Sequence, residues 1–231
     1  MKKRKAIKLI SILAIVVILI CTWLCKGSHN QTSNVHSKAY TVVVDAGHGG
    51  IDGGVSGKVT KVKESDLNLE IAKLLSAKLK EAGIIVVMTR NSYGGLYGTT
   101  ARGFKKRDLE KRVKIINSSN ADLMVSIHLN CYSSPVRRGA TTFFGDNKIE
   151  GEKLAKSIQK QFNSLSGQPR EFSAIKGDYY LLNSANCPST ICECGFLSNE
   201  EDEKLLLTKE YQQEIVDKIF LGIIEYLVAS S

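Results

Sequence analysis

Short apolar runs alternate with longer amphipathic segments along the chain from residue 39 onward. The short runs are typical of buried strands, and apolar residues spaced three or four positions apart are typical of helices that cover a sheet. We expect strands over 39–45, 84–89, 122–129, 140–144, 179–183 and 190–194. We expect helices over 67–79, with an end at Gly83, and over 108–117, 149–165, 199–207 and 211–228.

This alternation predicts an α/β fold made of a single three-layer domain. Its central sheet would be mostly parallel, with about six strands and helices on both faces. Ligand sites in such sheets lie beyond the carboxyl ends of the strands. The residues that follow each predicted strand are therefore the first place to look for chemistry.

The first 26 residues have a different pattern. Positions 9–25 are apolar and uncharged, and a cluster of lysine and arginine precedes them. Their length, ~17 residues, is at the lower limit for a membrane-spanning helix and slightly above a usual signal-peptide core. We expect a signal anchor over 1–26 with the following domain outside the cytoplasm; a cleaved signal peptide and a buried core helix are the alternatives. Residues 27–38 are polar and aperiodic, which predicts a flexible tether, and the folded domain would span 39–231.

The positive charge of the chain follows from this segment. The formal net charge is +9, from 32 basic and 23 acidic residues, and a basic chain can indicate a nucleic-acid-binding protein. However, six of the basic residues and none of the acidic ones lie among the first 26 positions. The remainder is almost balanced, so we expect no nucleic-acid partner and interpret the excess as a signal of membrane topology.

Two of the four histidines follow or end predicted strands. His48 lies in the glycine-rich turn after the first strand, and His128 ends the strand over 122–129, whereas His29 and His36 lie in the tether. A catalytic zinc site takes three protein ligands from His and carboxylate, with an open position for water. Glu64, just before the first long helix, is the leading third ligand. The spacing alone does not exclude three nearby carboxylates, Asp45, Asp52 and Asp66.

A further carboxylate, Glu193, lies in the otherwise apolar strand over 190–194. An acid at such a position is costly to bury and is tolerated where it faces a metal, a water or a cation. A paired structural charge is the alternative. Cys192 and Cys194 flank it, and strand alternation places them on the opposite face, in the core.

Five motifs together resemble the zinc-dependent N-acetylmuramoyl-L-alanine amidases (amidase type 3) of bacterial cell walls. They are VDAGHGGIDGG at 44–54, ESDLNLEIA at 64–72, MTR at 88–90, ADLMVSIHLN at 121–130 and ECGFLSN at 193–199. The resemblance extends over about residues 40–227. It implies that His48, Glu64 and His128 bind Zn²⁺ and that Glu193 is the catalytic carboxylate.

The resemblance also implies the reaction, which is hydrolysis of the amide between N-acetylmuramic acid and L-alanine in peptidoglycan. A membrane-anchored single domain looks most like the germination-specific subtype of spore-forming bacteria, which processes spore cortex toward muramic-δ-lactam. We therefore expect an exported enzyme, anchored to the membrane through its N-terminal segment or secreted, that faces the cell wall or cortex. A protein activator of unknown identity is a further candidate partner.

Two other functions are compatible with such a fold. One is a catalytically silent peptidoglycan-binding module, whose signature would be a missing ligand or glutamate. None of the four residues is missing here. The other is a zinc peptidase that acts on stem peptides, and only its products would distinguish it from an amidase.

Overall fold

The structure is a computed structural model that describes residues 39–146 and 148–230. The signal anchor expected over 1–26 and the tether over 27–38 lie outside these residues and stay predictions. Within the described part of the chain, no helix has both the length and the apolar character needed to cross a bilayer.

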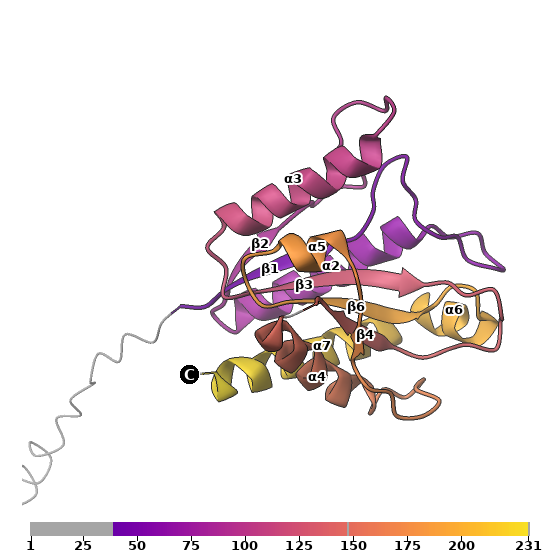
Figure 1. Cartoon of the computed structure of the whole chain (residues 1–231). Coiled ribbons are helices and arrows are strands. Elements are labelled where there is room, and N and C mark those ends of the chain that lie inside the picture. Colours follow the sequence, from indigo (N-terminus) through magenta and orange to yellow (C-terminus); the bar gives the residue numbers. More distant parts are fainter. Residues whose placement is uncertain (1–38, 147, 231) are drawn as a thin grey trace, which may run out of the picture. The chain divides into compact units, whose positions relative to one another are not determined.

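A six-stranded sheet forms the centre of the domain, in the order β2-β1-β3-β6-β4-β5 (Figure 1). Every neighbouring pair is parallel except β4 and β6, which are antiparallel. The expected mostly parallel sheet is therefore confirmed. The strands are β1 (Thr41–Ala46), β2 (Ile85–Met88), β3 (Leu123–Asn130), β4 (Thr141–Phe144), β5 (Ile175–Lys176) and β6 (Ser189–Phe196).

Helices cover both faces of this sheet, as the sequence predicts. One face packs against α2 (Glu64–Glu81) and α4 (Ile149–Phe162), and α7 (Lys209–Ala229) contacts both of these helices. The other face carries α3 (Phe104–Ser118) and the short α5 (Tyr180–Ser184), while α6 (Glu200–Leu206) packs against β6 and α7. Figure 1 shows the resulting three layers, with α3 on one side of the strands and α4 and α7 on the other.

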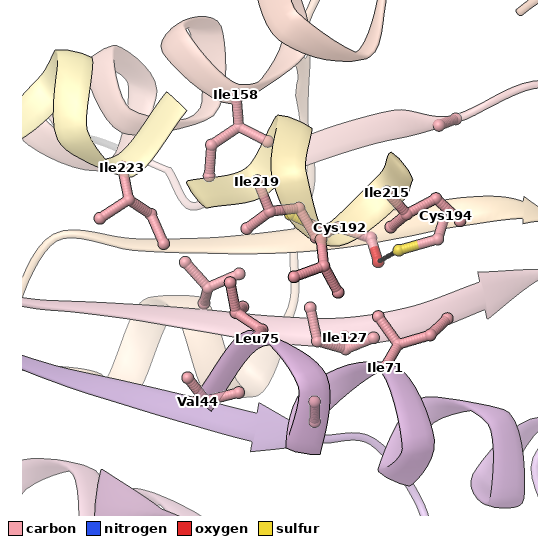
Figure 2. Packing of buried hydrophobic residues seen from close by; sticks show 14 of the residues in the cluster. Val44, Ile71, Leu75, Ile127, Ile158, Cys192, Cys194, Ile215, Ile219 and Ile223 are labelled. Atoms are coloured by element: carbon pink, nitrogen blue, oxygen red, sulfur yellow. Dashed lines mark hydrogen bonds between the residues drawn. The ribbon is translucent and has the colours of Figure 1, made fainter. Parts of the chain in front are cut away.

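Strand alternation divides the apolar side chains between two clusters. Val42 and Val44 of β1 belong to the large cluster under α2, α4 and α7, whereas Val43 belongs to the small cluster on the α3 and α5 side. Figure 2 shows Cys192 and Cys194 of β6 within the large cluster, together with isoleucines of α7. Both cysteines are fully buried free thiols, so their predicted role as core residues is confirmed.

One predicted strand is wrong. Residues 180–184 form α5, and the sixth strand is instead the two-residue β5. Leu181 and Leu182 are adjacent and both buried. Adjacent side chains of a strand point to opposite faces, whereas one turn of helix directs both leucines into the cluster beside β6. A short apolar run does not distinguish these two outcomes by its periodicity.

We predict that the fully buried isoleucines of α7 contribute strongly to the stability of the fold: Ile215, Ile219 and Ile223. Ile219 is fully buried, so Ile219→Ala should lower the free energy of unfolding by about 2–5 kcal/mol through lost burial and the cavity left behind. Leu221, on the same helix, is 47% exposed, and Leu221→Ala should change it by less than about 0.5 kcal/mol. Urea unfolding of both variants measures the difference. Equal effects would contradict this packing.

Candidate active site

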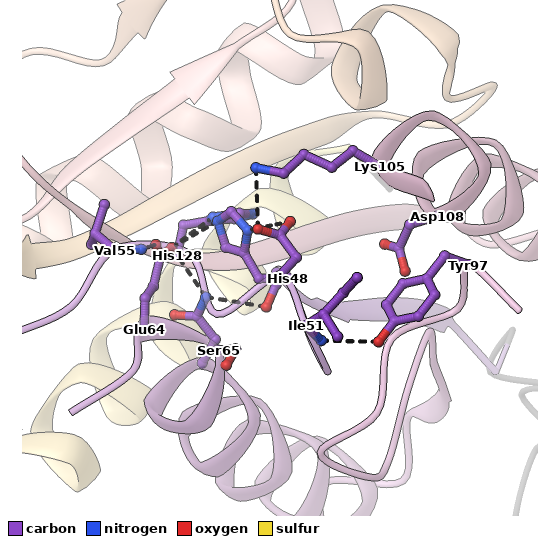
Figure 3. Close-up of polar contacts among 12 residues, drawn as sticks. His48, Ile51, Val55, Glu64, Ser65, Tyr97, Lys105, Asp108 and His128 are labelled. Carbon is purple, nitrogen blue, oxygen red and sulfur yellow. Dashed lines mark hydrogen bonds and ion pairs between the residues drawn. The ribbon is translucent and has the colours of Figure 1, made fainter. Parts of the chain in front are cut away.

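Strand order and register bring the predicted site residues together at the carboxyl edge of the sheet. His48 lies two residues after the end of β1, and His128 lies on the neighbouring β3. His128 is also the register partner of Glu193 on β6. Glu64 is the first residue of α2, which begins at the same edge. Figure 3 shows Glu64 beside the two imidazole rings.

Three of these side chains converge on one small space. The Glu64 Oε1 atom lies 3.3 Å from His48 Nε2 and 3.0 Å from His128 Nδ1. Ligand atoms in a tetrahedral zinc site with bonds of about 2.0–2.1 Å are separated by about 3.3 Å. Among the described residues, this is the one group of three or more His, Cys, Asp or Glu side chains with a metal-binding arrangement. The spacing and donor types therefore fit a zinc ion.

The carboxylate of Glu64 is fixed by hydrogen bonds from the surrounding backbone. The N–H of Val55 donates to Oε2, and the N–H of Leu129 donates to Oε1. The side-chain amide of Asn68, one turn further along α2, also donates to Oε1. Only 2% of Glu64 is exposed. Its orientation is therefore set by three independent elements of the fold.

Small residues allow the loop after β1 to approach the imidazoles. A Cβ atom on Gly47 would lie 2.2 Å from His128 Nε2, and one on Gly54 would lie 2.3 Å from Glu64 Oε2. His48 itself adopts φ 60°, in the left-handed region that non-glycine residues rarely occupy. Such local strain is typical of functional sites, where the surrounding structure enforces it.

His48 is oriented from its other side by Asp52. Its Nδ1 atom is 2.9 Å from Asp52 Oδ2, and Lys105 Nζ from α3 is 3.2 Å from Asp52 Oδ1. A carboxylate on the second nitrogen of a ligating imidazole fixes its tautomer and ring orientation. Asp52, one of the alternative ligands, thus lies behind His48 and outside the group that meets at Glu64.

Two buried arginines hold the backbone of the same loop. Arg90 donates to the carbonyl oxygens of Ala46 and Gly47, and Arg112 donates to those of Ala46 and His48. Arg112 is only 2% exposed. Its charge is balanced by Asp45, at 2.7 Å, and by Asp108, at 2.6 Å.

The remaining alternative ligands have other partners. Besides Arg112, Asp45 accepts hydrogen bonds from the hydroxyls of Thr89 and Ser126. Burial would raise the pKa of Asp45, but the Arg112 charge and these hydrogen bonds lower it to about 2. Asp66 accepts from the Ser65 hydroxyl and is not part of the metal-binding group.

The charges of the metal-binding group favour a cation at its centre. Burial alone would raise the pKa of Glu64, but hydrogen bonds with His128 and His48 hold it well below its usual range. Burial alone would lower the pKa of His48, yet Glu64 and Asp52 raise it to about 9. The carboxylates therefore stabilise positive charge at this position, which a divalent metal would supply.

Glu193 faces the same space from β6. It lines a cavity of about 240 Å³ together with His48, His128 and Tyr179. Its Oε2 atom is buried and has no hydrogen-bond partner among the residues that the structure describes. Burial raises the pKa of this carboxyl to about 7. A half-buried acid with one unpartnered oxygen, beside three side chains that could hold a metal, has the environment expected of a proton-transfer residue.

Comparison with known proteins agrees with the motifs. A family model described as N-acetylmuramoyl-L-alanine amidase matches residues 42–225. The chain belongs to this amidase family. The germination-specific N-acetylmuramoyl-L-alanine amidase of Bacillus subtilis is 36% identical over 230 residues, which cover 96% of each protein. The family resemblance of the sequence is therefore confirmed over nearly the whole length.

Solved amidase structures have the same fold. The CwlD amidase from Clostridioides difficile, in complex with the GerS lipoprotein, superposes with a TM-score of 0.79 at 37% identity. The match covers 82% of this chain and 99% of that one. An N-acetylmuramoyl-L-alanine amidase from Clostridium difficile 630 gives a TM-score of 0.75 at 32% identity, over 84% and 100% of the two chains.

Two residues that support this amidase site, Arg90 and Arg112, are not among the site residues that the sequence predicts. Arg90 belongs to the MTR motif, but the motif does not indicate which residues the arginine contacts. Arg112 had a usable signal: Asp108, Arg112 and Ile116 are four residues apart on the buried side of α3. Charged residues on the buried stripe of an amphipathic helix indicate an ion pair inside the protein. Their target, the loop after β1, becomes visible only in the folded structure.

We predict that the loop depends on Arg112. Arg112→Met should lower the free energy of unfolding by about 3–5 kcal/mol, because it leaves Asp45 buried without its charge partner. Lys111→Met removes an exposed charge from the same helix and should have an effect below about 0.5 kcal/mol. Urea unfolding compares the two. An Arg112→Met variant as stable as Lys111→Met would refute this role.

Proposed function

We propose that this protein is a zinc-dependent amidase that hydrolyses the bond between N-acetylmuramic acid and L-alanine in peptidoglycan. His48, Glu64 and His128 would hold the zinc ion, and Glu193 would transfer protons. The observation that carries this proposal is the position of Glu193, whose Oε2 atom has no hydrogen-bond partner in the described part of the chain, beside three side chains with zinc-like spacing.

When bound, zinc would polarise the scissile carbonyl and make water more acidic. The chain supplies the remaining chemistry. The Glu193 carboxylate accepts a proton from the attacking water and returns it to the nitrogen of the leaving amine. A pKa raised toward 7 suits both steps, because the group is then neither too weak a base nor too weak an acid at neutral pH.

The spore cortex is the form of peptidoglycan that we favour as the substrate. This rests on the relative named as germination-specific, which matches over 96% of this chain. The N-terminal segment 1–26 supports export, and we propose that it anchors the enzyme to the membrane or directs its secretion. CwlD is solved in complex with a lipoprotein, and this supports a protein partner here as well.

The proposed roles predict different losses in two kinds of variant. Glu193→Ala and Glu193→Gln should keep bound zinc but lose at least about 10²–10⁴-fold in turnover, because proton transfer is removed. His48→Ala and His128→Ala should lose both zinc and turnover, because each removes a ligand. Metal analysis beside a muropeptide-release assay separates these outcomes. Full activity in Glu193→Ala would refute the assignment.

The products of digestion identify the bond that is cleaved. An amidase releases an intact peptide with a new L-alanine amino terminus and leaves the lactyl carboxylate on the glycan. Mass spectrometry of digested cortex and vegetative peptidoglycan should detect both products, with faster release from cortex. Shortened peptides still attached to muramic acid would indicate a stem-peptide peptidase instead.

A further inference from the structure

A second hollow lies next to the catalytic cavity, on the β4 and β5 side. It has a volume of about 490 Å³, and we call it the arginine groove. Three arginines and three phenylalanines contribute to its lining, and no aspartate or glutamate does: Arg137, Arg138, Arg170, Phe143, Phe172 and Phe196. The catalytic cavity has a mixed lining, in which four carboxylates lie beside basic groups: Asp45, Asp52, Asp108 and Glu193 with Lys105, Arg112, His48 and His128.

The arginine groove lies beside Glu193, over strands β6 and β4. Phe196, three residues after Glu193 on β6, lines it, and so does Thr141 on β4, the antiparallel register partner of Glu193. Phe143 lines the groove and packs edge to face against Tyr179, with 5.4 Å between ring centroids. Tyr179 lines the catalytic cavity. One aromatic pair therefore separates the two hollows.

Two of the three guanidinium groups, both on exposed residues, lie against aromatic rings and have no carboxylate partner among the described residues. Arg137 lies over the ring of Tyr132, 3.8 Å from its centroid, and Arg170 lies 5.0 Å from the centroid of Phe172. These ring contacts are the side-chain interactions of Arg137 and Arg170 within the described part of the chain, and neither guanidinium has an ion-pair partner there. Arg138, by contrast, pairs with Glu201 and Asp202. An arginine stacked on an aromatic ring keeps its N–H groups available for a carboxylate.

The sheet order places the groove on one particular side of the bond that would be cleaved. The strands run β1, β3, β6, β4, so the metal-binding side chains come first, then Glu193, then the groove. If Glu193 returns a proton to the leaving nitrogen, that nitrogen lies on the Glu193 side of the metal. The chain that continues from this nitrogen is the peptide, and the glycan extends the other way.

We propose that the arginine groove binds free carboxylates of the peptide that leaves the glycan, with Arg137 and Arg170 as the recognition residues. This inference rests on the proposed amidase function. Peptidoglycan stem peptides contain acidic residues with free carboxylates, and these complement the two unpaired guanidinium groups. The enzyme would therefore prefer substrates whose peptide carries these charges.

Two synthetic substrates test this preference. Both are N-acetylmuramoyl peptides of the same sequence, one with free peptide carboxylates and one with all of them amidated. We expect kcat/KM of the wild-type enzyme to be about tenfold or more higher for the charged substrate, mainly through a lower KM. In the double variant Arg137→Gln and Arg170→Gln, this ratio should fall to about one.

The control variant is Arg102→Gln, which removes an exposed arginine outside the groove and should keep the wild-type ratio. Melting temperature and zinc content show whether each variant is folded and loaded. An unchanged ratio in the double variant would overturn the proposal. If the wild-type enzyme cleaves neither substrate, the amidase function itself fails, which is a distinct result.

Discussion

The site requires three electron-pair donors to stay close together at the carboxyl edge of the sheet. His48, Glu64 and His128 come from distant parts of the chain, and their ligand atoms all lie within 4.8 Å of one another. Donors at this spacing repel or bind protons unless a cation lies between them. The hydrogen bonds to Glu64 from α2, β3 and the loop before α2 hold the carboxylate in place. The strands, helix and loop that carry these contacts keep the three side chains close together.

The loop after β1, which carries His48, is held by two buried arginines. Carbonyl oxygens of the loop after β1 point to Arg90 and Arg112, both of which are buried. A buried ion pair such as Arg112 with Asp45 adds little stability relative to apolar packing. It does, however, give a glycine-rich loop fixed hydrogen-bond partners. We interpret these arginines as the reason that His48 keeps its strained backbone conformation.

The sequence predicted the parts of this structure that follow from periodicity. Runs of valine and isoleucine identified β1 and β3, and the histidines at their ends identified the edge of the sheet that carries the site. The strand predicted over residues 179–183 is wrong, because an apolar run of this length fits a strand or one turn of helix equally well. Composition alone left Asp45, Asp52 and Asp66 open as ligands. Long-range contacts decide between them, and only the fold supplies these contacts.

Sheet order also gives the proposed reaction a direction. The proposed metal ligands, the proposed proton-transfer residue Glu193 and the arginine groove lie over successive strands, β1 and β3, then β6, then β4. A substrate laid across these strands would place its amide at Glu193 and its peptide over the arginines. On this proposal, the mixed-charge catalytic cavity and the arginine groove would bind different parts of one substrate.

The most direct test of the account is a crystal structure of the zinc-loaded protein with anomalous diffraction at the zinc edge. We predict one strong peak about 2.0–2.2 Å from His48 Nε2, a Glu64 carboxylate oxygen and His128 Nδ1, with Glu193 near the open coordination position. A peak bound by other residues, or no peak between these three side chains, would contradict the central claim.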